Sequence, residues 1–184
     1  MKELHIQMVD LAGQHQRLRD DIDRAMAEVL RHGRYINGPE VYTFADSLTD
    51  YLGGARVVPC GNGTDALQAA LMALDLNPGD EVVLPSFSFV SPAEMVALLG
   101  LVPVPVEVSP DTYNLDPARV EAAITDKTRV IMPVHLFGRA AAMDEIVSLA
   151  EKYGLYVVED AAQSLGAACR VNGEEHYVGT IGHI

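Results

Sequence analysis

Apolar residues recur with a helical period over the first part of this chain. In residues 16–32 they lie three or four positions apart, from Leu18 to Leu30, and residues 39–52 repeat this spacing up to the pair Gly53-Gly54. Such spacing places the apolar side chains of a segment on one helical face. We therefore expect two amphipathic helices, which make residues 1–54 an N-terminal helical segment.

From residue 55 onward, short β-branched runs alternate with segments of helical period. The expected strands are residues 56–59, 81–84, 102–106, 129–134 and 155–159, and the expected helices are residues 64–74, 92–99, 117–124 and 141–153. This order predicts an α/β fold with a mostly parallel sheet covered by helices. The pair Asn172-Gly173 predicts a hairpin between residues 167–171 and the segment near Tyr177.

The last residues, Gly179 to Ile184, read as the approach to another strand, without a charged or polar tail. We therefore expect residues 55–184 to form a partial domain, incomplete at its C-terminus, and the chain to be a piece of a longer protein.

The acidic composition of the chain argues against nucleic acid as a binding partner. There are 13 basic and 26 acidic residues, a formal net charge of −13, and no Lys/Arg run that could neutralise successive phosphates, which excludes nucleic acid. A signal-peptide core is missing, and no stretch approaches the ~18 apolar residues of a membrane span, so we expect a cytoplasmic protein without a membrane partner.

The histidines lack metal-ligand spacing, so no metal site is expected. Cys60 and Cys169 are expected to be core thiols.

One loop is suited to binding a phosphate. Gly61-Asn62-Gly63-Thr64-Asp65 is expected to lead from a strand into a helix, where the backbone N–H groups of Gly63 and Thr64 and the Thr64 hydroxyl can face an anion. An ordinary turn with a helix N-cap is the alternative.

Asp160 is the second candidate, because it follows the apolar run Tyr156-Val157-Val158 and open α/β sheets bind ligands at the carboxyl ends of their strands. Its carboxylate can pair with a protonated ring nitrogen through a charge-assisted hydrogen bond of ~1.5–3 kcal/mol, or it can cap the following turn. Gln163 can reach a phenolic oxygen of the same ring or remain a surface amide. A phosphate cradle together with this acid suggests pyridoxal phosphate (PLP).

Two more strand ends carry groups of interest. The segment Pro85-Ser86-Phe87-Ser88-Phe89 follows a strand and has an aromatic ring that can stack on a flat cofactor or belong to the core. His135 ends the expected strand 129–134 on the side of the site, and both a catalytic and a structural histidine remain open.

Four motifs stand in a characteristic order and spacing: Gly61-Asn62-Gly63-Thr64-Asp65-Ala66-Leu67, Pro85-Ser86-Phe87-Ser88-Phe89-Val90, Pro133-Val134-His135-Leu136-Phe137-Gly138 and Glu159-Asp160-Ala161-Ala162-Gln163-Ser164. Together they resemble the DegT/DnrJ/EryC1/StrS family of PLP-dependent sugar aminotransferases, over essentially the whole chain. The resemblance implies the large domain of a fold-type I PLP-dependent transferase, with the small C-terminal domain absent from this chain.

Carried over by motif, the resemblance implies a role for each candidate residue. Gly63 and Thr64 would bind the phosphate, and Phe89 would stack on the ring. Asp160 would pair with the pyridine nitrogen, and Gln163 would contact the phenolic oxygen. Asp160 is the first catalytic candidate, and His135 is the second.

Within that family, Tyr35-Ile36-Asn37-Gly38-Pro39-Glu40-Val41 and Thr112-Tyr113-Asn114-Leu115-Asp116-Pro117 are most similar to the branch that acts on UDP-linked 3-oxo-2-acetamido-glucuronic acid. The resemblance implies transfer of an amino group, from glutamate, onto a nucleotide-linked keto-sugar in surface-polysaccharide or amino-sugar biosynthesis. It also implies a homodimer, because the family's sites form between two subunits.

The chain departs from the family in its lysines. The family's Schiff-base lysine lies in a segment that follows a sequence similar to residues 179–184, and none of Lys2, Lys127 and Lys152 occupies a matching position. The chain alone is therefore expected to be inactive. Two alternatives stay open: a PLP-dependent sugar dehydratase, in which a histidine replaces the lysine, and a non-catalytic PLP-binding pseudo-subunit. A dinucleotide-binding domain is disfavoured, because no G-x-G-x-x-G opens a first βαβ unit.

Overall fold

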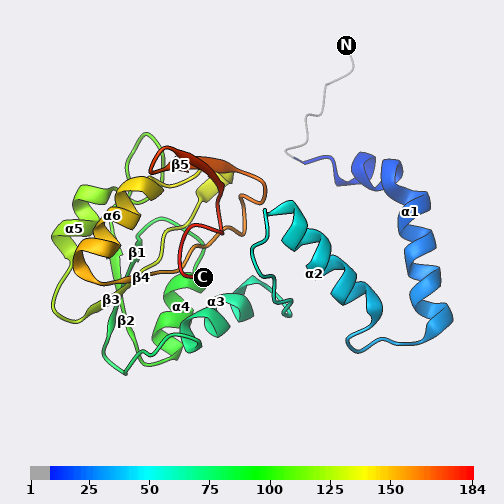
Figure 1. The fold of residues 1–184 in the computed structure, drawn as a ribbon, viewed down its shortest axis with the longest axis horizontal. Coiled ribbons are helices and arrows are strands. Elements are labelled where there is room, and N and C mark those ends of the chain that lie inside the picture. Colours follow the sequence, from blue (N-terminus) through cyan, green and yellow to red (C-terminus); the bar gives the residue numbers. More distant parts are fainter. Residues whose placement is uncertain (1–8) are drawn as a thin grey trace, which may run out of the picture.

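A computed structural model describes residues 9–184 of the chain (Figure 1). Its helices are α1 (Leu11–His32), α2 (Pro39–Tyr51), α3 (Gly63–Met72), α4 (Ser91–Leu98), α5 (Pro117–Ala123) and α6 (Met143–Tyr153), with a 3₁₀ turn at Leu136–Gly138. Its strands are β1 (Glu81–Pro85), β2 (Val102–Val106), β3 (Thr128–Ile131), β4 (Tyr156–Val157), β5 (Ala168–Val171) and β6 (Glu174–Tyr177). Figure 1 shows an α/β body, with α1 and α2 extending away from it.

The central sheet has four strands in the order β2-β1-β3-β4, and each neighbouring pair is parallel. A parallel bridge between Val134 and Asp160 continues this arrangement past the ends of β3 and β4. The loops that follow these strands therefore begin at one common edge of the sheet. The predicted α/β class with a parallel sheet is confirmed, and so is the hairpin, which β5 and β6 form as an antiparallel pair.

Strands β1 and β3 contribute to two hydrophobic cores, one on either face of the sheet. Val83 and Ile131 pack in one cluster with residues of α5 and α6, whereas Val82 and Val130 pack in a second cluster with residues of α3 and α4. Successive side chains of a strand point to opposite faces. Because helices cover both faces, these strands are continuous apolar runs rather than alternating ones.

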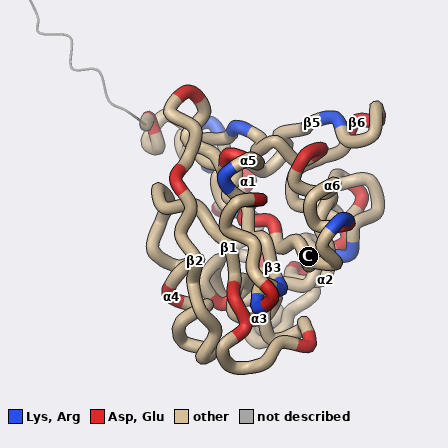
Figure 2. The backbone as a smooth tube through the Cα atoms, turned by 90° about the vertical axis from the view of Figure 1, so that its left-hand side faces the viewer, with Lys and Arg blue, Asp and Glu red and all other residues tan. Residues whose placement is uncertain are grey.

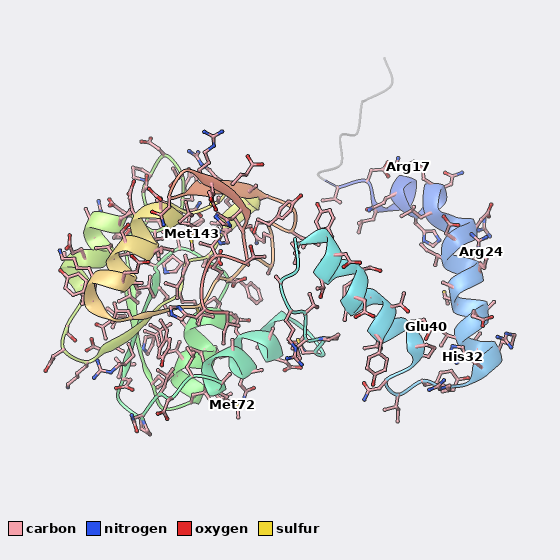
Figure 3. The ribbon with its side chains drawn as sticks, in the orientation of Figure 1. Arg17, Arg24, His32, Glu40, Met72 and Met143 are labelled. Carbon is pink, nitrogen blue, oxygen red and sulfur yellow. The ribbon has the colours of Figure 1, made fainter. Side chains whose placement is uncertain are left out.

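Helices α1 and α2 lie outside both cores, and none of residues 11–32 or 39–51 is buried. At their junction, His32 Nε2 lies 2.9 Å from Glu40 Oε1 (Figure 3). At the far end of α2, the ring of Tyr51 stacks on that of Tyr177 in β6 with centroids 5.5 Å apart. Few described contacts thus hold these helices to the body.

Acidic positions are spread over the chain rather than gathered on one element (Figure 2), as the net charge of −13 leads one to expect. Within residues 9–184, no helix is both long and apolar enough to cross a membrane. The cytoplasmic location stays a prediction.

Three predictions about local structure are wrong. Residues 56–59 form no strand, since they pair with neither edge of the sheet, and the Val58 side chain is 76 % exposed. Strands β3 and β4 are shorter than expected, because Pro133 has no N–H to continue the ladder. Cys60 is exposed and is not a core thiol, whereas Cys169 is partly buried.

Candidate functional site

A cavity of about 230 Å³ opens at the carboxyl edge of the sheet. Its wall combines the start of α3, the loop after β1 and residues that follow β3 and β4: Gly63, Thr64, Leu67, Ser88, Phe89, Ser91, Val134, Asp160, Ala162 and Gln163. The five residues proposed from the sequence as cofactor contacts all belong to this wall. A larger hollow of about 480 Å³ beside β4 includes none of the five, so size alone does not identify the site.

The N-terminus of α3 forms a polar part of this wall. Asn62 caps the helix, because its Oδ1 accepts a hydrogen bond from the Asp65 N–H at 2.9 Å. The first N–H groups of a helix have no partner inside it, so those of Gly63 and Thr64 are available to an anion. A Cβ on Gly63 would meet no atom within 4 Å, which leaves its backbone open. The loop therefore contains a helix N-cap, and this cap leaves the N–H groups of Gly63 and Thr64 available to an anion.

The hydroxyl of Thr64 is tied to a second helix. Its Oγ1 lies 2.8 Å from Oγ of Ser91, the first residue of α4, and Ser91 is itself buried. This bond joins the starts of α3 and α4 at the cavity wall. The two hydroxyls can share one proton between them and direct the other toward a bound acceptor.

Asp160 is held through its backbone on both sides. Its N–H donates to the Pro133 carbonyl at 2.9 Å, and its carbonyl accepts from the His135 N–H at 3.0 Å. On the side chain, Oδ1 accepts from the Ala162 N–H at 3.1 Å, which is the turn-capping bond considered above. Within residues 9–184, Oδ2 has no hydrogen-bond partner. The carboxylate can therefore cap the turn with one oxygen and receive a ring nitrogen with the other.

Gln163 is oriented by a single hydrogen bond, in which its Oε1 accepts from the Phe137 N–H at 2.8 Å. Since Oε1 must face that N–H, the amide nitrogen Nε2 is the group left to donate to an acceptor. The bond also supports a left-handed backbone at Phe137, where φ is 56°. Non-glycine residues adopt that conformation rarely and often near functional sites.

The loop after β1 supplies an exposed ring and an unsatisfied hydroxyl. The Phe89 side chain is 69 % exposed, so Phe89 does not belong to the core. Ser88 Oγ is buried in the same wall, yet it has no hydrogen-bond partner within the described part of the chain. Buried polar groups in native proteins almost always have a partner, so this hydroxyl marks a place for a polar ligand atom.

His135 follows β3 at the carboxyl edge of the sheet, and its side chain lies in the interior and not in the cavity wall. Its ring is fully buried; Nδ1 accepts from the Ala141 N–H at 3.0 Å, and Nε2 is 2.9 Å from Glu159 Oε2. This placement makes His135 a neighbour of the Asp160 backbone rather than a group in contact with the cavity.

Glu159 is the residue that sequence reasoning missed. Its carboxylate accepts hydrogen bonds from His135 and from the backbone N–H groups of Gly179, Ile181 and Gly182. Burial acts to raise the pKa of Glu159, but these four hydrogen bonds outweigh burial and hold its pKa below the usual value. The only signal in the sequence is an acid directly after a buried strand, beside the more conspicuous Asp160.

Neither described lysine lies at the cavity. Lys152 Nζ is 2.6 Å from Glu121 Oε1 on the outer surface of α6. Lys127 precedes β3, at the opposite edge of the sheet, where its carbonyl accepts from the Glu81 N–H. Lys2 lies outside the described residues.

Comparison with known proteins identifies several relatives of this chain. The UDP-2-acetamido-2-deoxy-3-oxo-D-glucuronate aminotransferase of Pseudomonas aeruginosa is 53 % identical over 163 residues, which is 89 % of this chain and 45 % of that protein. A crystal structure of a DegT DnrJ EryC1 StrS aminotransferase from Brucella abortus superposes with a TM-score of 0.90 at 44 % identity, covering 97 % of this chain and 49 % of that one.

A third match is the crystal structure of NtdA from Bacillus subtilis with bound cofactor PMP, at 38 % identity and a TM-score of 0.79, over 90 % of this chain and 39 % of that one. The chain thus spans less than half the length of these three proteins. Residues 16–184 match the family model described as the DegT/DnrJ/EryC1/StrS aminotransferase family. Nearly the whole chain is similar to these proteins in fold and sequence, and it belongs to the DegT/DnrJ/EryC1/StrS aminotransferase family.

Proposed function

We propose that this chain holds the PLP of an aminotransferase that moves an amino group from glutamate onto a nucleotide-linked keto-sugar. The observation that carries the proposal is the meeting of Gly63, Thr64, Phe89, Asp160 and Gln163, from three separate stretches of chain, in one cavity. The Pseudomonas aeruginosa relative, named for a UDP-linked oxo-sugar, supports the class of substrate. Glutamate as donor and a homodimeric assembly are part of the proposal on the strength of the family resemblance.

The groups in the cavity wall fit this cofactor. The free N–H groups of Gly63 and Thr64 match a phosphate, and the exposed ring of Phe89 offers a stacking surface. The free Oδ2 of Asp160 matches a pyridinium N–H, and Nε2 of Gln163 matches a phenolic oxygen.

PLP, when bound, supplies an electron sink for the carbon atom that gains or loses the amino group. The part of Asp160 in this chemistry is to keep a proton on the ring nitrogen, because a carboxylate paired with that nitrogen favours its charged form. The N–H groups at the start of α3 would hold the phosphate and so restrict the orientation of the cofactor in the cavity.

We further propose that the chain by itself binds the cofactor reversibly and does not transfer amino groups. This rests on the positions of Lys127 and Lys152, which lie away from the cavity. The family model and the named relative favour an aminotransferase over a sugar dehydratase and over a non-catalytic pseudo-subunit.

The proposed role of Asp160 can be tested on this chain with pyridoxamine phosphate (PMP), which needs no lysine. In Asp160→Asn the ring nitrogen loses its charge-assisted hydrogen bond, so we expect the Kd for PMP to rise roughly 10- to 100-fold, which corresponds to ~1.5–3 kcal/mol. Isothermal titration calorimetry measures the Kd directly.

Asp126→Asn serves as the matched control, because Asp126 is exposed in the loop before β3, at the other edge of the sheet. Its Kd should equal that of the parent chain. Equal values for Asp160→Asn and the parent, or no saturable binding by the parent, would contradict the proposed function.

A further inference from the structure

Four hydrogen-bond donors surround the side chain of Glu159, and a neutral side chain could not accept from all of them. His135 Nδ1 accepts from the Ala141 N–H, so the ring proton is on Nε2, which donates to Glu159 Oε2. The other three partners of the carboxylate are backbone N–H groups, so all four groups around it are donors. Only an ionised carboxylate accepts on both oxygens without presenting a donor of its own.

These bonds join three parts of the chain that are far apart in sequence. Oε2 accepts from His135, just past β3, and from the Gly179 N–H, both at 2.9 Å. Oε1 accepts from the N–H groups of Ile181 at 2.7 Å and Gly182 at 2.5 Å. The turn at residues 179–182, the end of β3 and the end of β4 are thus held at one buried carboxylate.

The residues after this turn lie along the free edge of β4. The His183 N–H donates to the Val157 carbonyl, and the Glu159 N–H donates to the Ile184 carbonyl, each at 2.8 Å. Glu159 therefore holds this segment through its backbone as well as through its side chain. A loss of the side-chain bonds would loosen the edge of the sheet on which Asp160 stands.

The link to the cavity is short. Asp160 is the next residue, and its carbonyl accepts from the backbone N–H of His135, whose ring is bonded to Glu159. The side chains of residues 159 and 160 point to opposite sides of the extended chain, one into the interior and one toward the cavity. Because the two residues are adjacent, holding the Glu159 side chain in place restricts the direction of the Asp160 side chain.

We propose that Glu159 is a positioning residue of the cofactor site: by holding His135 and the turn at residues 179–182, it fixes the direction in which Asp160 presents its free oxygen to the ring nitrogen. This inference rests on the proposed function for the identity of the ring. Glu159 itself does not touch the ligand.

The test is a double-mutant cycle on the whole chain with PMP as the probe. Glu159→Gln keeps the shape of the side chain. The NH₂ group that replaces one carboxylate oxygen cannot accept hydrogen bonds, so at least two of the four are lost. We expect its Kd for PMP to rise on the order of tenfold. Because Glu159 acts through Asp160, the double variant Glu159→Gln/Asp160→Asn should bind PMP no more weakly than Asp160→Asn alone.

A second readout tests the anchoring itself. Amide hydrogen exchange followed by NMR should be faster in Glu159→Gln at Gly179, Ile181 and Gly182 than in the parent chain. Glu175→Gln is the control, because Glu175 is exposed in β6; it should leave both the exchange rates and the Kd unchanged. If Glu159→Gln does not unfold cooperatively, Glu159→Asp replaces it in the cycle. Aspartate keeps the negative charge, but its side chain is one methylene shorter, so the carboxylate lies farther from its hydrogen-bond donors.

The outcomes separate the two proposals. Failure of the parent chain to bind PMP overturns the proposed function. A Kd for Glu159→Gln equal to the parent's, while Asp160→Asn binds weakly, overturns the positioning role alone. Losses that multiply in the double variant also overturn that role, because Glu159 would then act independently of Asp160.

Discussion

At the scale of single residues, the loop after β1 places two exposed phenylalanines in different surroundings. Phe89 lines the cavity, whereas Phe87 lies outside it and packs near Tyr113, with ring centroids 5.7 Å apart. Both side chains are more than half exposed. Their shared loop and similar exposure make them a matched pair for testing whether the cavity, rather than surface aromaticity, binds the ring.

We expect Phe89→Ala to weaken PMP binding and Phe87→Ala to leave it unchanged. Loss of a stacking partner costs about 1 kcal/mol beyond the lost contact area, or about fivefold in Kd. Fluorescence titration of both variants and the parent chain with PMP measures this difference. Equal Kd values for Phe89→Ala and Phe87→Ala would show that Phe89 does not contact the ring.

At the scale of elements, helices α1 and α6 share an amphipathic pattern and differ in what their apolar faces meet. The apolar face of α6 belongs to the buried cluster that contains Val83 of β1 and Val157 of β4, and Ile146 is fully buried there. The apolar side chains of α1 meet no such surface within the described residues, and Met26 is 60 % exposed. Helical period alone does not distinguish the two cases, since burial depends on a partner face.

We therefore expect Ile146→Ala to lower the free energy of unfolding by about 2–5 kcal/mol, through lost burial and the cavity that remains. Met26→Ala should change it by less than ~0.5 kcal/mol, because an exposed side chain leaves no cavity. Urea denaturation followed by circular dichroism gives both values. A large effect of Met26→Ala would mean that α1 is part of the cooperative unit.

At the scale of the whole molecule, the chain consists of an α/β body with both cores and an N-terminal helical pair outside them (Figure 1). The residues of the two cores begin at Leu67 in α3. We propose that residues 1–54 and 55–184 are separate structural units, as the change in hydrophobic pattern near residue 55 predicts.

Limited digestion with trypsin tests this division. The earliest cuts within the described residues should fall N-terminal to the body, after exposed arginines of α1 or after Arg34 and Arg56, because the backbone there is least protected by packing. Mass spectrometry should then find a persistent fragment that begins near residue 57. Early cuts after Arg119, Arg129 or Lys152, inside the body, would contradict this division.

Much of the fold and of the site followed from the sequence by itself. The alternation of strand and helix patterns determined the parallel α/β arrangement, because each pattern depends on side-chain periods that are local. Strand-end motifs singled out Phe89, Asp160 and Gln163, since the carboxyl ends of parallel strands meet at one edge of the sheet. Gly63 and Thr64 were chosen because they follow an expected strand at residues 56–59, and that strand does not form. The position of Gly63 and Thr64 at the cavity depends on the packing of α3 against α4, which the sequence pattern alone does not predict.

Only the tertiary structure decided which segments pair with a neighbouring strand and which polar side chains form hydrogen bonds with distant residues. Residues 56–59 have the composition of a strand and form none, because a strand exists only through hydrogen bonds to a neighbour. His135 turned inward because Ala141 and Glu159 satisfy both of its ring nitrogens. The anchoring by Glu159 depends on residues 179–182, some twenty positions away, and no local pattern encodes that meeting.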